Sequence, residues 1–294
     1  MELCRRRRVK ILMMGNRFDD VRFDKRAALR HVAVVMEENF VYDVLIAGGG
    51  LAGQCLARQL KLGRPELSVA VVDFEQRPLP EAAFKVGEAT SELGAHYFAE
   101  KLQLKDYLDR EQLLKNGLRF FFGAAHGPLA NRPEYGPRDF PPVSSYQLDR
   151  GRLENHLRDL NQAAGVTLRE GFGVSEISLG ENGAPHTTVI RERHGAQTLS
   201  LRSTWLVDCT GRQRLLQKKL GLGLPSALKH SASWFRVKGQ CDVEKFVSPE
   251  NAAWHAKVPG GIRYRSTNHL VGHGYWVWLI PLSSGNTSIG IVVD

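Results

Sequence analysis

Three glycines and one aspartate have the types and spacing of a dinucleotide site. Gly48, Gly50 and Gly53 match the pattern GxGxxG directly after the apolar run VYDVLIA. The first glycine of this pattern permits a sharp turn, the second lets a pyrophosphate approach the backbone, and the third lets helix and strand pack closely. The helix that follows offers amide donors and the positive end of its dipole. Asp73 ends a second apolar run, VAVVD, where its carboxylate can accept hydrogen bonds from an adenosine ribose. Without a nucleotide, the glycines would form a plain tight turn, and Asp73 would be an exposed acid at the end of a strand.

The elements that must position these residues form a βαβ unit over residues 41–73. A buried strand, a helix over 51–62 with one apolar face, and a strand over 69–73 have the length that such a unit needs. A later helix is predicted over 152–164. Three alternating segments predict a small antiparallel meander: 173–179, 187–193 and 197–202. Four segments predict strands of a second sheet: 117–122, 233–238, 275–281 and 287–293.

Composition and charge exclude several classes of protein. The 294 residues are 43% hydrophobic and 24% charged, which is typical of a globular protein. The net charge is +9, but residues 1–35 hold ten basic and four acidic groups, so no nucleic-acid-binding surface is expected across the body. Residues 1–35 are interpreted as a basic leader without stable structure. No apolar run approaches the length of about 18 residues that a membrane span needs.

The metal-binding and redox-active residue types show no site pattern. The four cysteines and ten histidines lack the spacing of metal ligands, so no metal site is predicted. The cysteines show neither a CxxC pair nor a dense disulfide framework, so they are interpreted as reduced thiols of a cytoplasmic protein.

The chain resembles the flavoprotein monooxygenases with a glutathione-reductase-type FAD fold. The resemblance rests on the meander and on a strand over 205–208 that runs into the sequence CTGR. It implies that the turn from Asp208 to Gly211 packs beside the cofactor. It also implies that Arg150, in YQLDRGRLENHL, lies near the flavin or its pyrophosphate, with Arg152 as the alternative and a solvated charge as the plain interpretation.

The fold class expected from this resemblance is α/β: a Rossmann-like FAD-binding domain with an inserted β-meander, plus an incomplete antiparallel-sheet substrate domain. Residues 36–115 and 146–225 are predicted to form the discontinuous FAD-binding domain, and 116–145 and 226–294 the substrate domain. Members of the family carry a second flavin motif farther along, which this sequence does not match, so the chain is interpreted as C-terminally truncated.

Two further motifs narrow the resemblance to flavin-dependent halogenases of the tryptophan-halogenase-like group. They are KVGEAT at 85–90 and WVWLIP at 276–281. The resemblance implies that the GEAT segment lies near the flavin, with Glu88 as a candidate catalytic group, and that the WxWxIP strand lies between flavin and substrate. Alternation along a strand places Trp276 and Trp278 on one face, where two rings can wall a cavity or pack a core.

The catalytic lysine of these halogenases has no counterpart at its expected position. The family's lysine follows the GEAT segment, receives the oxidised halogen and presents it to the substrate; here that position falls on His96. Lys101 lies five residues farther, about 140° around and about 7.5 Å along a helix that begins near Ser91, and Lys85 precedes the segment. His96 is therefore the catalytic candidate, as an acid, a base or a hydrogen-bond donor, and weak or absent chlorination is expected. A helix histidine bound to a backbone carbonyl is the plain alternative.

The resemblance implies an FAD-dependent oxidoreductase that uses reduced FAD and oxygen to oxidise a small organic substrate. A separate flavin reductase is the expected source of the reduced flavin. One alternative is a single-component monooxygenase that takes hydride from NAD(P)H and hydroxylates an aromatic substrate. The other is a non-catalytic fragment of the FAD fold. No sequence feature identifies the substrate.

Overall fold

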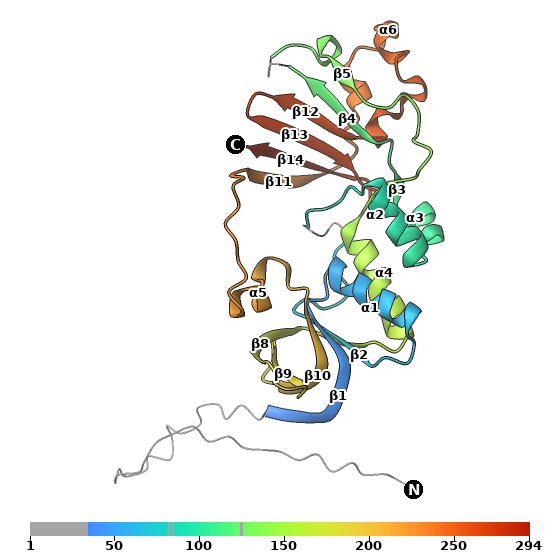
Figure 1. Cartoon of the computed structure of the whole chain (residues 1–294). Coiled ribbons are helices and arrows are strands. Elements are labelled where there is room, and N and C mark those ends of the chain that lie inside the picture. The colour runs from blue at the N-terminus through green and yellow to red at the C-terminus, as the bar shows by residue number, and fades with distance from the viewer. Residues whose placement is uncertain (1–34, 82, 84, 124–125) are drawn as a thin grey trace, which may run out of the picture. The chain divides into compact units, whose positions relative to one another are not determined.

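The computed structural model describes residues 35–81, 83, 85–123 and 126–294 (Figure 1). The predicted leader, 1–35, lies outside these residues except for Val35. The described chain forms two compact units, one of residues 35–77 and 157–222 and the other of residues 78–156 and 223–294. The domain boundaries expected from the sequence differ from this division and stay a prediction. None of the described helices is long and apolar enough to cross a membrane.

The first unit is built on a mixed six-stranded sheet in the order β7-β2-β1-β10-β9-β8. Its strands are β1 (Val35–Ala47), β2 (Val69–Asp73), β7 (Thr167–Glu170), β8 (Phe172–Ser178), β9 (His186–Glu192) and β10 (Thr198–Asp208). Strand β1 pairs in parallel with β2 and β10, and β2 pairs in parallel with β7. Strands β10, β9 and β8 pair antiparallel and form the meander. The segments expected at 197–202 and 205–208 are a single strand, β10, which reaches from the meander into the parallel part of the sheet.

Both faces of this sheet are covered, which explains why its central strands are apolar without alternation. On one face, helix α1 (Leu51–Gly63) packs Ala57, with the partly buried Leu56 and Leu60, against Val44, Ile46 and Val71. The residues of the other face form a second buried cluster: Tyr42, Leu45, Ala70, Val72, Ile190, Leu199 and Leu201. This packing holds the turn between β1 and α1 at the carboxyl end of the parallel strands.

The second unit contains a six-stranded sheet in the order β11-β14-β13-β12-β4-β5 (Figure 1). Its strands are β4 (Leu118–Phe122), β5 (Glu134–Tyr135), β11 (Ser231–Lys238), β12 (Thr267–Gly272), β13 (Tyr275–Pro281) and β14 (Asn286–Val293). A smaller sheet pairs β3 (Leu113–Leu114) with β6 (Tyr146–Gln147). The expectation of a purely antiparallel sheet is wrong at one pair, because β12 and β4 run parallel.

Short helical segments connect these strands. The described α-helices other than α1 are α2 (Glu92–His96), α3 (Lys105–Glu111), α4 (Arg150–Ala163), α5 (Leu215–Lys219) and α6 (Ala252–His255). A π-helical turn, η1 (Tyr97–Lys101), follows α2 directly. The 3-10 turns are η2 (Leu129–Asn131), η3 (Gly211–Gln213), η4 (Val243–Phe246) and η5 (Pro259–Arg265). Helix α4 begins in the second unit and ends in the first.

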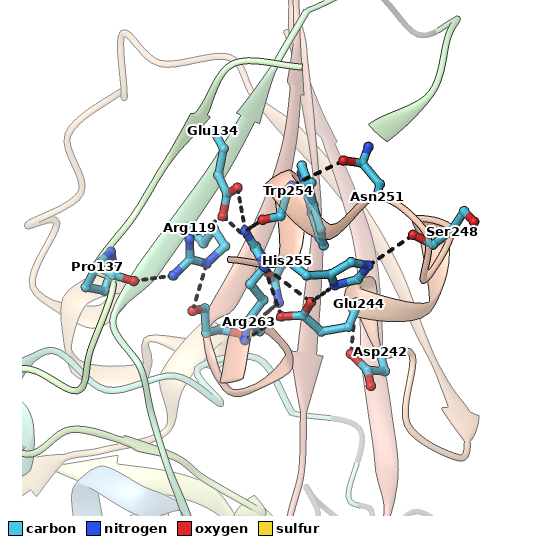
Figure 2. Close-up of polar contacts among 12 residues, drawn as sticks. Arg119, Glu134, Pro137, Asp242, Glu244, Ser248, Asn251, Trp254, His255 and Arg263 are labelled. Atoms are coloured by element: carbon cyan, nitrogen blue, oxygen red, sulfur yellow. Dashed lines mark hydrogen bonds and ion pairs between the residues drawn. The ribbon is translucent and has the colours of Figure 1, made fainter. Parts of the chain in front are cut away.

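Two buried arginines of the second unit, Arg119 and Arg263, form an ion cluster with two partly buried glutamates, Glu134 and Glu244 (Figure 2). Arg263 has no exposed surface and reaches Glu134 at 2.8 Å and Glu244 at 3.2 Å. Its guanidinium also donates to the carbonyl of Trp254 at 2.8 Å and stacks over that ring, 3.7 Å from the centroid. Both carboxylates are thus neutralised inside the fold. The ion cluster joins strands β4 and β5 to η4 and η5.

Candidate functional site

The first and third glycines of the GxGxxG pattern are required by packing. Gly48 has a φ of +103°, and its amide donates to the carbonyl of Val72 at 2.8 Å. A Cβ at Gly48 would lie 2.3 Å from the carbonyl oxygen of Cys209. A Cβ at Gly53 would lie 1.9 Å from the carbonyl oxygen of Gly48. Side chains are thus excluded where the turn meets β10 and where helix α1 meets the turn.

The second glycine, Gly50, is open. It is the N-cap of helix α1, and a Cβ built on it would meet no atom within 4 Å. Its backbone is extended, with φ of −71° and ψ of −171°, no side chain caps the helix, and no acidic residue occupies the first turn. The start of this 13-residue helix therefore has open space at Gly50 and no competing carboxylate in its first turn. This arrangement fits the pyrophosphate of a dinucleotide.

Asp73 ends β2 beside this turn. A Cβ at Gly49 would lie 2.6 Å from the Cβ of Asp73, so the two segments are in close contact. The Oδ2 atom of Asp73 forms an ion pair with Arg158 of helix α4, and its Oδ1 atom accepts a hydrogen bond from the amide of Glu75 at 3.4 Å. The sequence argument missed Arg158, because a charged residue in the polar stretch HLRDLNQ is typical of an exposed helix face.

The turn after β10 lies next to the glycine turn. The amide of Cys209 donates to the carbonyl of Ala47 at 2.7 Å, which joins the ends of β10 and β1. Asp208 accepts hydrogen bonds from the Thr210 amide at 3.0 Å and from the Leu216 amide at 2.8 Å. Burial opposes ionisation of Asp208, but these and the Thr210 hydroxyl bond outweigh it and lower its pKa. Gly211 has a φ of +59°, with no atom within 4 Å of a Cβ. Asp208 therefore shapes the turn, and Gly211 leaves space beside it.

In the second unit, Arg150 binds the segment that contains the GEAT motif. Its guanidinium donates to the carbonyl of Val86 at 2.6 Å and forms an ion pair with Glu154 at 2.7 Å. Glu88 is 3% exposed and is paired with the buried Arg236, whose Nε lies 2.9 Å from the Glu88 carboxylate. The alternative arginine, Arg152, pairs with Glu81 at 3.1 Å. The carboxylate of Glu88 is thus held by a cation, and its catalytic role stays a prediction.

The tryptophans of the WxWxIP motif pack on one face of the second sheet. Trp278 is buried with Ile280, Leu282 and Val292, and Trp276 and Trp234 pack against the same cluster. A Cβ at Gly290 on the neighbouring strand would lie 2.2 Å from the ring of Trp278, so the glycine makes room for the indole. Trp278 therefore contributes to a core. Its role toward a substrate stays a prediction.

His96 is exposed at the end of helix α2. The helix begins at the expected place, because the Ser91 hydroxyl accepts a hydrogen bond from the amide of Gly94 at 3.2 Å. Beyond His96 the chain continues as the π-helical turn η1. The α-helical spacing from which the position of Lys101 was predicted therefore does not apply there.

The structure brings a different lysine to the GEAT segment. Lys115 is 3% exposed, and its Nζ donates to the carbonyl of Thr90, the last residue of that segment. Its own amide donates to the carbonyl of Ser145 at 2.8 Å. Burial lowers the pKa of Lys115, while the nearby charge of Glu92 opposes the shift. The sequence argument considered Lys85 and Lys101 at this segment and missed Lys115. Lys115 follows Thr90 by 25 residues and lies directly after β3, which pairs with β6.

Within the described part of the chain, no group of three or more His, Cys, Asp or Glu side chains is placed to hold a metal ion. The described cysteines, Cys55, Cys209 and Cys241, are not joined in disulfide bonds.

Comparison with known proteins agrees with a nucleotide site of this kind. The family model described as "FAD binding domain" matches residues 41–288. The flavin-dependent halogenase chlA of Dictyostelium discoideum is 28% identical over 290 residues, which cover 88% of this chain and 46% of that protein. The 1H-pyrrole-2-carbonyl-[peptidyl-carrier protein] chlorinase of Pseudomonas fluorescens is 23% identical over 268 residues, covering 86% of this chain and 56% of that protein. The chain thus spans about half the length of these curated relatives.

Solved structures share the fold. The halogenase PltM in complex with phloroglucinol and FAD superposes with a TM-score of 0.68 at 18% identity, covering 86% of this chain and 52% of PltM. The flavin-dependent halogenase CmlS superposes with a TM-score of 0.63 at 21% identity, covering 87% of this chain and 42% of CmlS. The fit of the glycine turn and the match over most of the sequence lead to one conclusion: the chain belongs to the FAD binding domain family, with FAD as its cofactor, and its relatives are flavin-dependent halogenases.

Proposed function

We propose that the protein is a halogenase-like FAD-dependent oxidoreductase in which Lys115 carries the halogen. The observation that supports this most directly is the buried Lys115 ammonium bound to the carbonyl of Thr90, because the resemblance to halogenases calls for a lysine at the GEAT segment. Reduced FAD supplies the two-electron reduction of oxygen from which the oxidised halogen derives. The residues that would hold FAD are Gly48, Gly50, Gly53 and Asp73, with the turn from Asp208 to Gly211 beside them.

The environment of Lys115 suits a halogen acceptor. Attack on an oxidised halogen needs the lone pair of the neutral amine, and burial favours that form by lowering the pKa. With hypohalous acid, the Lys115 amine exchanges an N–H bond for an N–halogen bond, and the displaced proton leaves with the hydroxyl group of the acid as water. The contact with Thr90 holds the nitrogen while this exchange takes place.

The test compares halogenation by the parent protein and by Lys115→Met. The protein is supplied with FAD, NADH, a separate flavin reductase, bromide and phloroglucinol, the compound that PltM holds, and the brominated product is measured by mass spectrometry. We expect the parent to produce it and Lys115→Met to lose at least about 100-fold in rate, since loss of a nucleophile removes the covalent step. FAD affinity and thermal unfolding of the variant are measured alongside.

Two control variants separate this proposal from its competitors. Lys101→Met removes an exposed lysine of η1 and should leave bromination unchanged. His96→Ala tests the residue that the sequence favours: loss of activity there, with Lys115→Met active, would refute the role of Lys115 and support His96. Bromide-independent hydroxylation driven by NADPH without a reductase would instead support a single-component monooxygenase. Absence of bound FAD would support a non-catalytic fragment.

A further inference from the structure

A buried arginine joins three segments of the first unit at the glycine turn. Arg158, in the second half of helix α4, has no exposed surface. Its Nη2 donates to the carbonyl of Gly49 at 2.9 Å and forms an ion pair with Oδ2 of Asp73. Its Nε lies 3.2 Å from Oε1 of Glu170 at the end of β7. One side chain thus contacts the glycine turn and the ends of two neighbouring parallel strands, β2 and β7.

The two carboxylate oxygens of Asp73 consequently differ. Oδ2 is occupied by the guanidinium of Arg158, whereas Oδ1 accepts one long hydrogen bond, 3.4 Å, from the amide of Glu75. The Asp73 side chain is 13% exposed, so it keeps a small open surface. A carboxylate whose plane is held on one side can offer its second oxygen in a defined direction.

We propose that Arg158 is a positioning residue that holds the Asp73 carboxylate so that Oδ1 accepts a hydrogen bond from the adenosine ribose of FAD. This inference rests on the FAD site proposed at the glycine turn and adds the means by which ribose is recognised. Because Arg158 also holds the Gly49 carbonyl, it couples the direction of the carboxylate to the shape of the turn.

Two other roles for Arg158 fit the structure less well. An arginine near the end of the second strand can bind the 2′-phosphate of a dinucleotide, but Arg158 has no exposed surface with which to do so. A role in stability alone is weakly supported, since the desolvation of a buried ion pair offsets much of its attraction. Arg77 provides a comparison, because it pairs with Glu170 at 2.9 Å and with Asp159 at 2.7 Å in the same unit.

The experiment measures dissociation constants of the full chain for FAD and for an FAD analogue whose adenosine ribose lacks both hydroxyls. The parent should prefer FAD by at least about tenfold, the effect of one hydrogen bond to a charged acceptor. Arg158→Lys and Arg158→Gln should lower this preference to less than about threefold, because neither side chain has the forked donors that bridge Gly49 and Asp73. Asp73→Asn should lower it similarly, and the combination with Arg158→Lys should cause no further loss.

The control is Arg77→Gln, which removes comparable bonds to Glu170 and should keep the full preference for FAD. Thermal unfolding identifies variants that have not folded, and the conservative Arg158→Lys carries the test if Arg158→Gln is among them. Equal loss of affinity for FAD and for the analogue in Arg158→Lys would overturn the inference while leaving the FAD site intact. A parent protein that binds neither compound would overturn the FAD site itself, and this inference with it.

Discussion

Gly50 and Gly53 lie three residues apart, yet one added methyl group at each should have opposite consequences. At Gly53 the new Cβ would lie 1.9 Å from the Gly48 carbonyl oxygen, where ordinary contacts begin at 3.4 Å. Helix α1 would therefore have to move by roughly 1.5 Å away from β1, and overpacking of this kind costs about 1–3 kcal/mol or more. At Gly50 the Cβ meets nothing within 4 Å and the backbone is extended, so stability should change by less than about 1 kcal/mol.

For FAD binding, Gly50→Ala should be the damaging substitution. The methyl group of Gly50→Ala occupies the space through which the pyrophosphate approaches the amides of helix α1. Loss of one hydrogen bond to a charged phosphate costs about 1.5–3 kcal/mol, so the dissociation constant for FAD should rise about 10- to 100-fold. Gly50→Val should bind still more weakly.

Two measurements test these expectations on the same preparations. Urea unfolding without FAD gives the free energy of unfolding, and flavin fluorescence titration gives the dissociation constant. Gly53→Ala should unfold at lower urea, whereas Gly50→Ala should unfold with the parent and fail to retain FAD. The reasoning is refuted if Gly50→Ala binds FAD within threefold of the parent, or if Gly53→Ala is as stable as the parent.

Three further predictions concern the second unit. Arg263→Met should lower the free energy of unfolding by about 3–5 kcal/mol in urea titrations, because it removes the fully buried cation that pairs with the partly buried carboxylates of Glu134 and Glu244. Burial opposes ionisation of Glu134, but the hydrogen bonds and charges of Arg263 and Arg119 outweigh burial and lower the Glu134 pKa below its ordinary value of 4.5. The stability that ionised Glu134 contributes should therefore be complete above pH 4.5 and should fall as acid protonates the carboxylate. Glu134→Gln should flatten that part of the curve of stability against pH. Gly290→Ala, whose Cβ would lie 2.2 Å from the Trp278 ring, should cost about 1–3 kcal/mol, and an unchanged melting curve would contradict that packing.

The sequence alone determined the features that depend on neighbouring residues. An apolar run followed by GxGxxG produces a strand, a turn and a helix from local sterics, and the structure has these elements at β1 and α1. The start of helix α2 at Ser91 follows from its capping hydroxyl in the same way. The meander followed from the alternation of apolar residues, although its last segment and the next strand form one element, β10.

The tertiary structure decided which distant charges meet. Lys115 reaches Thr90 across 25 residues, and Arg158 reaches Asp73 across 85. Spacing along the chain carries no signal of either contact, because sheet pairing and helix packing create them. Both cations belong to types that are normally exposed, and only partners brought by the fold compensate their burial. These contacts of Lys115 and Arg158 therefore depend on the tertiary structure and could not be predicted from the sequence.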